Sequence, residues 1–174
     1  MTAISFFVKF LVEDRSTNYS EFNSDMNPDY FVEKMERFSF DKKGKLQNEL
    51  ESDLVKHFPH DDSLELKSPR MKIYEKKGKP WNVVSESAWI NSDGTIVLLN
   101  GNVYIWKLDN YGNKEYEIIT SDLTIKPEEK FAQTKKAARI TNQGTVTNTI
   151  GLKVVFKEGR VQLSDRVRTI YEPK

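Results

Sequence analysis

The chain has 174 residues, which is enough for one domain with a sizeable core or for two small ones. Its 27 lysines and arginines almost balance 26 aspartates and glutamates, so the net charge of +1 gives no general attraction to nucleic acid or to an anionic membrane. The sequence has no cysteine, which excludes disulfides, thiolate metal sites, iron–sulfur clusters and catalytic thiols.

The N-terminal segment is apolar but short. A mostly apolar run covers residues 3–12 and reaches about half of the ~20 residues that a bilayer span needs. No basic segment precedes the run and no small-residue cleavage site follows it, so it is a poor signal peptide. It fits an amphipathic helix, a strand or cloning remnant, or the outer end of a membrane anchor. Residues 13–28 have the composition of a polar linker.

From residue 29 onward, apolar stretches alternate with turn signals. Residues 29–35 (DYFVEKM) fit a helical turn or an entering strand, and the strand is favoured. Turn signals occur at residues 42–44, 59–62, 77–80, 91–94, 110–113 and 158–159. Strands between turns at this spacing are typical of an all-β sandwich or barrel. One segment disagrees, because four apolar residues are spaced by four as in a helix, and it stays open between helix and strand: Leu46, Leu50, Leu54 and Phe58.

The stretch TIVLLNGNVYIW, residues 95–106, has alternating apolar residues on both sides of Asn100-Gly101, which is the strongest short signal for a hairpin. It belongs to a repeat with apolar residues at relative positions 0, 2, 7 and 9. The first two copies, 32 residues apart, are Leu64, Leu66, Met71, Ile73 and Ile96, Leu98, Val103, Ile105. A weaker third copy has a polar residue at the second place (Phe131, Gln133, Ala138, Ile140), and a degenerate fourth has irregular spacing (Val161, Leu163, Val167, Ile170). Where the second copy has Gly101 the first has Pro69, which cannot adopt the positive φ of a type I′ turn. The shared element is therefore predicted to be a bend between strands of a stacked unit.

No catalytic constellation is visible. The histidines of HFPHDD, residues 57–62, could suggest a metal site, but the proline and turn residues around them indicate an exposed loop. Glu51, Glu128 and Glu129 form no paired-carboxylate pattern, and no phosphate-binding glycine loop, Ser-His-Asp set or HExxH occurs. We expect no enzymatic activity, no metal and no cofactor. Lysine clusters at residues 42–45, 76–79 and 135–136 fit solvated turns or contacts with lipid phosphates.

Three stretches together resemble the LptC family: PWNVVSESAWINSDGTIVLLNGNVYIW, EYEIITSDLTIKPEE and NQGTVTNTIGLKVVFKEGRVQLSDRVRTIYE. The resemblance covers about residues 33–171. LptC is the periplasmic, membrane-anchored component of the lipopolysaccharide export machinery, and LptA and the N-terminal domain of LptD share its repeat. The resemblance implies an all-β, open β-jellyroll-like, V-shaped stack of antiparallel strands, which favours a strand over residues 46–58. It also implies that residues 1–12 are a short helical or anchor remnant, followed by the polar linker 13–28 and a periplasmic domain over 29–174.

By resemblance, the protein is a non-enzymatic component of the transport bridge at the periplasmic face of the Gram-negative inner membrane, and serves outer membrane biogenesis. It would receive lipopolysaccharide from the LptBFG ABC transporter and pass it to LptA, holding the lipid A acyl chains in a groove. Strand alternation places in that groove, besides Leu64 and Ile96, the residues Phe38, Phe40, Leu66, Met71, Ile73, Leu98, Val103, Ile105, Leu123, Ile125, Phe131, Ile140, Leu152, Val154, Phe156, Val161 and Leu163. Leu66 and Val161 match positions where the family contacts lipid. Apolar alternation reports burial, so each residue also fits a closed core.

The resemblance assigns partners to the two open sheet edges, which invite strand addition from another chain. The edge at residues 33–45 would dock on LptF and LptG, the edge at residues 161–171 would contact LptA, and either edge allows self-association. The expected partner contacts are Gly44, Gly144, Val167, Arg168 and Tyr171. Both glycines also fit ordinary turn positions.

Two rival functions use the same fold class. A carbohydrate-binding jellyroll would need two or three aromatic rings coplanar on one open face, and the candidates are Trp81, Trp89, Trp106, Tyr104 and Tyr171. A structural adaptor without a ligand would bind neither sugar nor lipid.

Overall fold

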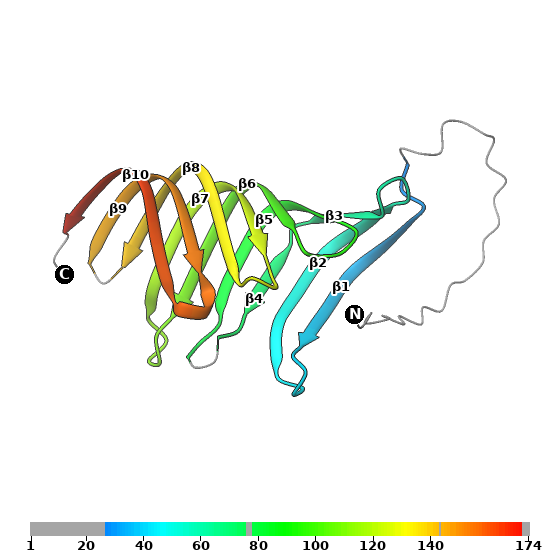
Figure 1. Cartoon of the computed structure of the whole chain (residues 1–174), viewed down its shortest axis with the longest axis horizontal. Helices are drawn as coiled ribbons and strands as arrows, with labels where there is room; N and C mark the ends of the chain where they lie inside the picture. The colour runs from blue at the N-terminus through cyan, green and yellow to red at the C-terminus, as the bar shows by residue number, and fades with distance from the viewer. Residues whose placement is uncertain (1–26, 76–77, 143, 172–174) are drawn as a thin grey trace.

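The computed structural model describes residues 27–75, 78–142 and 144–171, which form one sheet of ten antiparallel strands (Figure 1). The elements are β1 (Tyr30–Phe40), β2 (Leu46–Phe58), β3 (Ser63–Lys67), β4 (Arg70–Ile73), β5 (Trp81–Ile90), β6 (Val97–Leu108), β7 (Lys114–Lys126), β8 (Phe131–Asn142), β9 (Thr145–Val155), the 3-10 turn η2 (Phe156–Glu158) and β10 (Arg160–Tyr171). The strands follow one another in chain order across the sheet, and β4 pairs with β2 and β5. The predicted all-β, jellyroll-like fold is confirmed.

The segment over residues 46–58 is strand β2, as the family resemblance implied. It pairs with β1 on one side and with β3 and β4 on the other, so hydrogen bonds to neighbouring strands satisfy its backbone. The spacing of its leucines does not separate helix from strand, because residues four apart share a face in both. In addition, β2 changes its buried face midway. Leu50 is buried in the first half and Val55 in the second.

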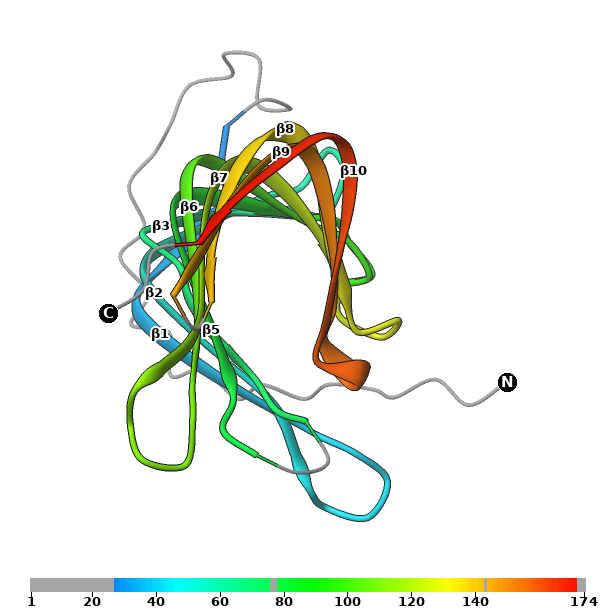
Figure 2. The same ribbon diagram turned by 90° about the vertical axis from the view of Figure 1, so that its left-hand side faces the viewer.

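Most strands bend near the middle, so that the sheet arches over into two facing halves (Figure 2). The bends coincide with register shifts in β5–β8 and β10 and with the break between β3 and β4 at Ser68-Pro69. We call this line of bends the crease; it is marked by residues with positive φ, namely Lys34, Ser68, Gly101, Asp122, Gly151 and Arg166.

Buried hydroxyls run along the crease and satisfy backbone carbonyls there. Thr120 donates to the carbonyl of Ala137 (2.9 Å), and Thr134 donates to that of Ser121 (3.0 Å). Ser52 and Thr149 make equivalent bonds in β2 and β9. Because a buried carbonyl without a partner is costly, these hydroxyls allow the strands to bend inside a well-packed sheet.

The core lies between the two facing halves and is built from rows of paired residues that cross the strands. In one row each residue is opposite the next on the neighbouring strand: Val32, Val55, Leu66, Ala88, Leu99 and Leu123, and the pair Leu152 and Leu163 continues it in β9 and β10. A second row contains Leu50, Met71, Val83, Ile105, Ile118 and Ile140. The apolar interior therefore extends from the first strand to the last.

The expected bend at Asn100-Gly101 is confirmed, because β6 continues through it as one strand and Gly101 has φ +74°. The assignment of Ile96 and Leu98 to the interior is wrong. The buried residues are Val97 and Leu99, which are 3% and 1% exposed.

The error comes from the spacing within the repeat. Leu66 and Met71, five residues apart, share the interior because the chain breaks at Ser68-Pro69 between them. In β6 no break separates the two halves, so the interior residues keep the same parity, from Leu99 to Val103.

The expected anchor, residues 1–12, lies outside the described residues, as does the expected linker except for residues 27 and 28. Within the described part of the chain, no helix has the length and apolar character needed to cross a bilayer.

Candidate functional site

Most of the predicted groove residues face the interior between the two halves of the sheet. Those at most 7% exposed are Leu66, Met71, Ile73, Val103, Ile105, Leu123, Ile125, Ile140, Leu152, Val154 and Phe156. Val161 packs against them and is half-buried. Their burial is established, whereas their contact with a ligand stays a prediction.

Four predicted groove residues do not lie in the interior. Phe38 and Phe40 are 49% and 61% exposed. Phe38 pairs with Glu49, on the face opposite to Leu50, because β1 and β2 both change their inward parity at the crease. Leu98 alternates with the buried Val97 and Leu99 and therefore faces outward.

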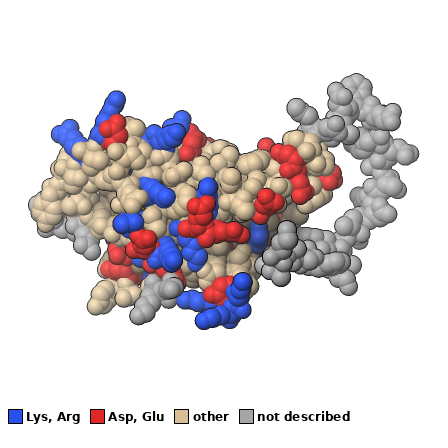
Figure 3. Space-filling model, in the orientation of Figure 1, with Lys and Arg blue, Asp and Glu red and all other residues tan. Residues whose placement is uncertain are grey.

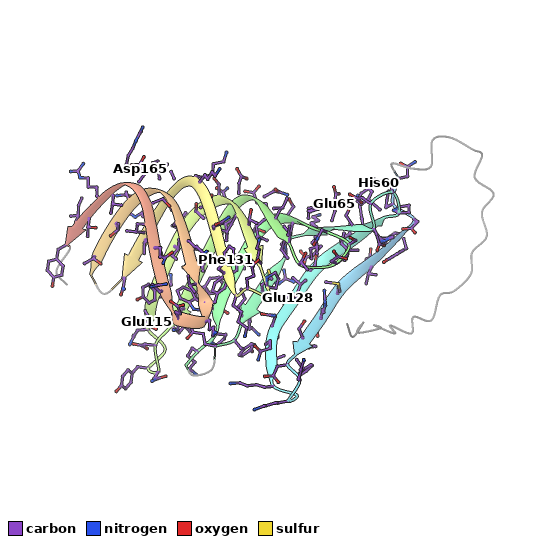
Figure 4. The ribbon with its side chains drawn as sticks, in the orientation of Figure 1. His60, Glu65, Glu115, Glu128, Phe131 and Asp165 are labelled. Carbon is purple, nitrogen blue, oxygen red and sulfur yellow. The ribbon has the colours of Figure 1, made fainter. Side chains whose placement is uncertain are left out.

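Phe131 is the fourth of these residues. It begins β8, precedes the buried Ala132 and lies on the outer face (Figure 4). The ammonium groups of Lys153 and Lys126 lie 3.9 and 5.7 Å from its ring centroid. These cation–π contacts explain an aromatic residue at this position without a ligand.

The interior becomes accessible at the two edges of the sheet. β1 and β10 each have one neighbouring strand, so the sheet has two open edges among the described residues. On β10, Leu163 is opposite the buried Leu152 but is itself 36% exposed. On β1, Val32 is opposite the buried Val55 and is half-buried. The interior rows are therefore buried in the middle strands and partly exposed to solvent at both edge strands.

Away from the crease, side chains close a second boundary of the interior, which we call the mouth. The indole N–H of Trp81 donates to a carboxylate oxygen of Glu75 (2.5 Å), and the Lys107 ammonium donates to the same oxygen (3.1 Å). The Trp81 ring meets the edge of Phe156, with centroids 5.9 Å apart. Trp81 lies before the bend of β5, in one half of the sheet, and Phe156 lies after the bend of β9, in the other half. Their contact therefore joins the two facing halves.

A second contact closes the mouth nearer to β1. The ammonium of Lys130, in the β7–β8 turn, donates a hydrogen bond to the side chain of Gln47 in β2. A cavity of about 300 Å³ beside this bond is lined almost entirely by polar side chains of both charges, including Asp41, Glu128 and Lys157. This polar cavity is unsuited to an apolar ligand.

Gly101 and Asn102 of the repeat make hydrogen bonds that hold the bend of β6. The Gly101 N–H donates to the Asp122 carboxylate (3.2 Å), and the Asn102 backbone and side chain both donate to Glu86. Lys136 pairs with Asp122 at 3.3 Å. Gly101 and Asn102 thus anchor the bend of β6 to β5 and β7, which is a structural role.

The predicted partner contacts lie at the ends of the molecule. Gly44 (φ +75°) closes the β1–β2 turn, where Asp41 accepts hydrogen bonds from two backbone N–H groups. Gly144 (φ +81°) lies in the β8–β9 hairpin, between the paired residues Asn142 and Thr145. Positive φ by itself accounts for both glycines. The other predicted contacts, Val167, Arg168 and Tyr171, are all exposed on β10.

The histidine loop differs from its sequence interpretation. His57 ends β2, and its side chain is only 12% exposed. Its two ring nitrogens lie 2.6 Å from Asp29 and 2.7 Å from Asp62. Because both partners are carboxylates that accept, an imidazolium with two N–H donors satisfies the site best, and these bonds raise the pKa of His57.

His57 also links strands. The Tyr30 ring stacks on the imidazole with centroids 4.5 Å apart, which joins the start of β1 to the end of β2. No group of three or more metal-ligating side chains suited to an ion occurs within residues 27–75, 78–142 and 144–171. The histidine therefore supports the N-terminal edge.

The aromatic residues do not form the platform that a carbohydrate site needs. Trp81 is fully buried. Trp106 and Tyr104 stack on each other, with centroids 5.0 Å apart. Tyr171 lies on the edge strand β10, whereas Trp89 lies on β5 in the centre of the sheet, so the two rings are far apart. We find no specific support for sugar stacking.

Sequence reasoning missed Trp81 and Glu75, which form the mouth. From the sequence, Trp81, which follows Pro80 at a strand start, is only a candidate ring for sugar stacking. Trp81 lies two residues before the buried Val83, and this alternation was the available sign that its side chain faces the interior. Its contact with Phe156 depends on a pairing across 75 residues and no local pattern reports it.

Chemically, the interior offers apolar side chains and hydroxyls that already bind backbone carbonyls. The one buried ammonium, among the described residues, is that of Lys107, and it is paired with Glu75 at the mouth. The interior therefore suits long apolar chains.

Comparisons with known proteins agree with this geometry. The sequence profile described as lipopolysaccharide-assembly, LptC-related, matches residues 2–172. Comparison with individual curated proteins gives no match. Among solved structures, the chain is similar to the crystal structure of LptH from Pseudomonas aeruginosa, the LptA-homologous periplasmic component of the conserved lipopolysaccharide transport device. The similarity has a TM-score of 0.53 and 7% identity and covers 72% of this chain and 95% of LptH, so it concerns the fold.

Proposed function

Because the chain belongs to the LptC family, we propose that it binds lipopolysaccharide by its acyl chains between the two halves of the sheet. The bound lipid would then move along the sheet, from the transporter side to the next component of the bridge, without being chemically altered. The observation that carries this proposal is the continuous apolar interior, sealed in the middle strands and open at both edges.

Acyl chains match this interior energetically. Each methylene buried from water contributes about 0.8 kcal/mol, so several chains supply a large driving force without any specific polar contact. Rows made mostly of Leu, Ile and Val give similar free energy at each step along the sheet. Such a surface suits transfer better than it suits one fixed binding position.

Entry of lipid requires the two halves to separate, because the interior residues pack against each other in this structure. The crease cannot open, since the strands continue through it. Among the described residues, the mouth is held by side-chain contacts, chiefly Trp81 with Phe156, Glu75 with Lys107, and Lys130 with Gln47. We therefore infer that the acyl chains enter at the mouth.

The edges support the proposed partners. β1 would receive lipopolysaccharide from LptF and LptG of the LptBFG transporter, and β10 would pass it to LptA. Both strands expose apolar side chains, including Phe31 (66%) on β1, and Val167 (51%) and Tyr171 (69%) on β10. Residues 1–12 would belong to an anchor in the inner membrane, with the sheet in the periplasm.

Photo-crosslinking tests the proposal. A photoreactive phenylalanine at Val161 or Leu163 faces the interior near the open edge, whereas one at Gln162 on the same strand faces away. We expect the first two positions, and not Gln162, to capture lipopolysaccharide when the exporter runs with ATP. Equal labelling at all three positions, or labelling at Gln162 alone, would place the lipid outside the interior.

A further inference from the structure

The net charge of +1 conceals an uneven distribution along the sheet. Residues 131–171, which hold β8–β10, contain eight lysines and arginines but only two acidic residues, Glu158 and Asp165. Residues 29–67, which hold β1–β3, contain ten acidic and seven basic residues. Figure 3 shows acidic side chains gathered over the β1–β3 end and basic ones along the upper edge of the β8–β10 end. Figure 4 places Glu65 and His60 at the first end and Asp165 at the other.

The two acidic residues of the β8–β10 end, which we call the basic end, already form local ion pairs. Glu158 pairs with Arg160 at 2.8 Å, and Asp165 lies 3.8 Å from Arg166. Among the described residues, no carboxylate lies within ion-pair distance of Arg168. The end of the sheet therefore keeps a strong positive charge.

The positive charge is concentrated on one face of the edge strand. Arg168 is opposite Asn148, which is opposite Arg139, so two arginines flank one residue on the outer face. Arg160 precedes Val161, which packs against the core, so its side chain also points outward. Thr169 and Tyr171, which alternate with Arg168, lie on the other face of β10. The edge is basic outside and partly apolar inside.

A strand that adds to β10 places its side chains directly opposite those of β10. Apolar residues on its inner face would continue the apolar interior, and acidic residues on its outer face would meet Arg160 and Arg168. Strand β1 of this same chain has this character: Val32 and Met35 pack toward the core, while Glu33 and Glu36 alternate with them.

We propose that β10 selects a protein partner whose edge strand is apolar on its inner face and acidic on its outer face, and that charge attraction guides its docking. The inference rests on the proposed handover to LptA and adds the chemistry by which the partner strand is recognised. Exposed apolar residues on the same strand favour a protein over a simple polyanion, because an anionic surface alone gives Val167 and Tyr171 nothing to pack against.

Association kinetics with LptA of the same organism test the inference. Attraction between opposite charges raises association rates by about 10- to 1,000-fold and weakens as salt screens it. We expect the association rate of the wild type to fall about tenfold from low to physiological salt. The double variant Arg160→Glu with Arg168→Glu should associate about tenfold more slowly at low salt and lose most of the salt dependence.

The matched control makes the same change of charge at the other end. Lys42→Glu with Lys43→Glu alters two exposed residues of the β1–β2 turn and should associate like the wild type. Circular dichroism shows whether each variant keeps its fold. If LptA binds but neither salt nor the arginine variant changes the rate, the charge inference is wrong and the handover stands. If LptA does not bind the wild type at any salt concentration, the handover itself is wrong, and the inference falls with it.

Vesicles containing phosphatidylglycerol provide the remaining comparison. We expect no binding that depends on Arg160 and Arg168. Vesicle binding lost in the arginine variant, together with unchanged LptA kinetics, would assign the basic end to a lipid surface and overturn the inference.

Discussion

Two neighbouring leucines of β6 test the register of the interior. Leu99 is 1% exposed and lies between Ala88 and Leu123, whereas Leu98 faces outward and pairs with Trp89. Truncating a buried leucine to alanine costs about 2–5 kcal/mol, because it removes apolar contacts and leaves a cavity. We expect Leu99→Ala to reduce the free energy of unfolding by about 3 kcal/mol and Leu98→Ala by less than about 1 kcal/mol.

Urea unfolding followed by circular dichroism measures the difference. With a slope of about 2 kcal/mol per molar urea, the Leu99 variant should unfold at a midpoint about 1.5 M lower. The Leu98 variant is the matched control, since the same atoms are removed one residue away. A larger loss for Leu98→Ala would restore the hairpin register about Asn100-Gly101 and refute the row of paired residues on which the interior is built.

Four further outcomes follow from the same structure. Since the carboxylates beside His57 raise its pKa, its stabilisation is complete below about pH 6.5 and is lost as pH rises through the raised pKa, so His57→Asn should flatten the pH dependence of the thermal midpoint. Gly151→Ala should cost about 1–3 kcal/mol in urea unfolding, because φ is +77° and the new Cβ would lie 3.0 Å from Ser164; adding Ser164→Gly should recover part of that loss. Gly144→Arg should impair lipopolysaccharide export or partner binding while circular dichroism shows a retained sheet, and normal export would leave it as a turn glycine. Val167→Pro, on the open edge, should weaken LptA capture about five- to tenfold with a small change of thermal midpoint, and full capture would place the handover elsewhere.

Local pattern predicted the strands well. Alternating apolar residues and turn signals located the sheet, and the proline at position 69 was enough to reject a tight hairpin at Asn100-Gly101. Residues 46–58 show the limit of local spacing: residues four apart share a face in a helix and in a strand, and the family resemblance favoured the strand that is observed.

The sequence by itself determined that this chain is all-β, that it carries no catalytic constellation and that its apolar residues line one face of each strand. Only the tertiary structure decided which apolar residues reach the interior. In β2 the buried face changes at the crease, from Leu50 to Val55, whereas β6 keeps its parity through the bend, so that Leu99 is buried and Leu98 is not. Contacts between distant segments likewise set the mouth, where Trp81 meets Phe156, and the His57 site, where the end of β2 binds Asp29, the residue before β1. These contacts join residues far apart in the chain, and no local periodicity encodes which of them meet.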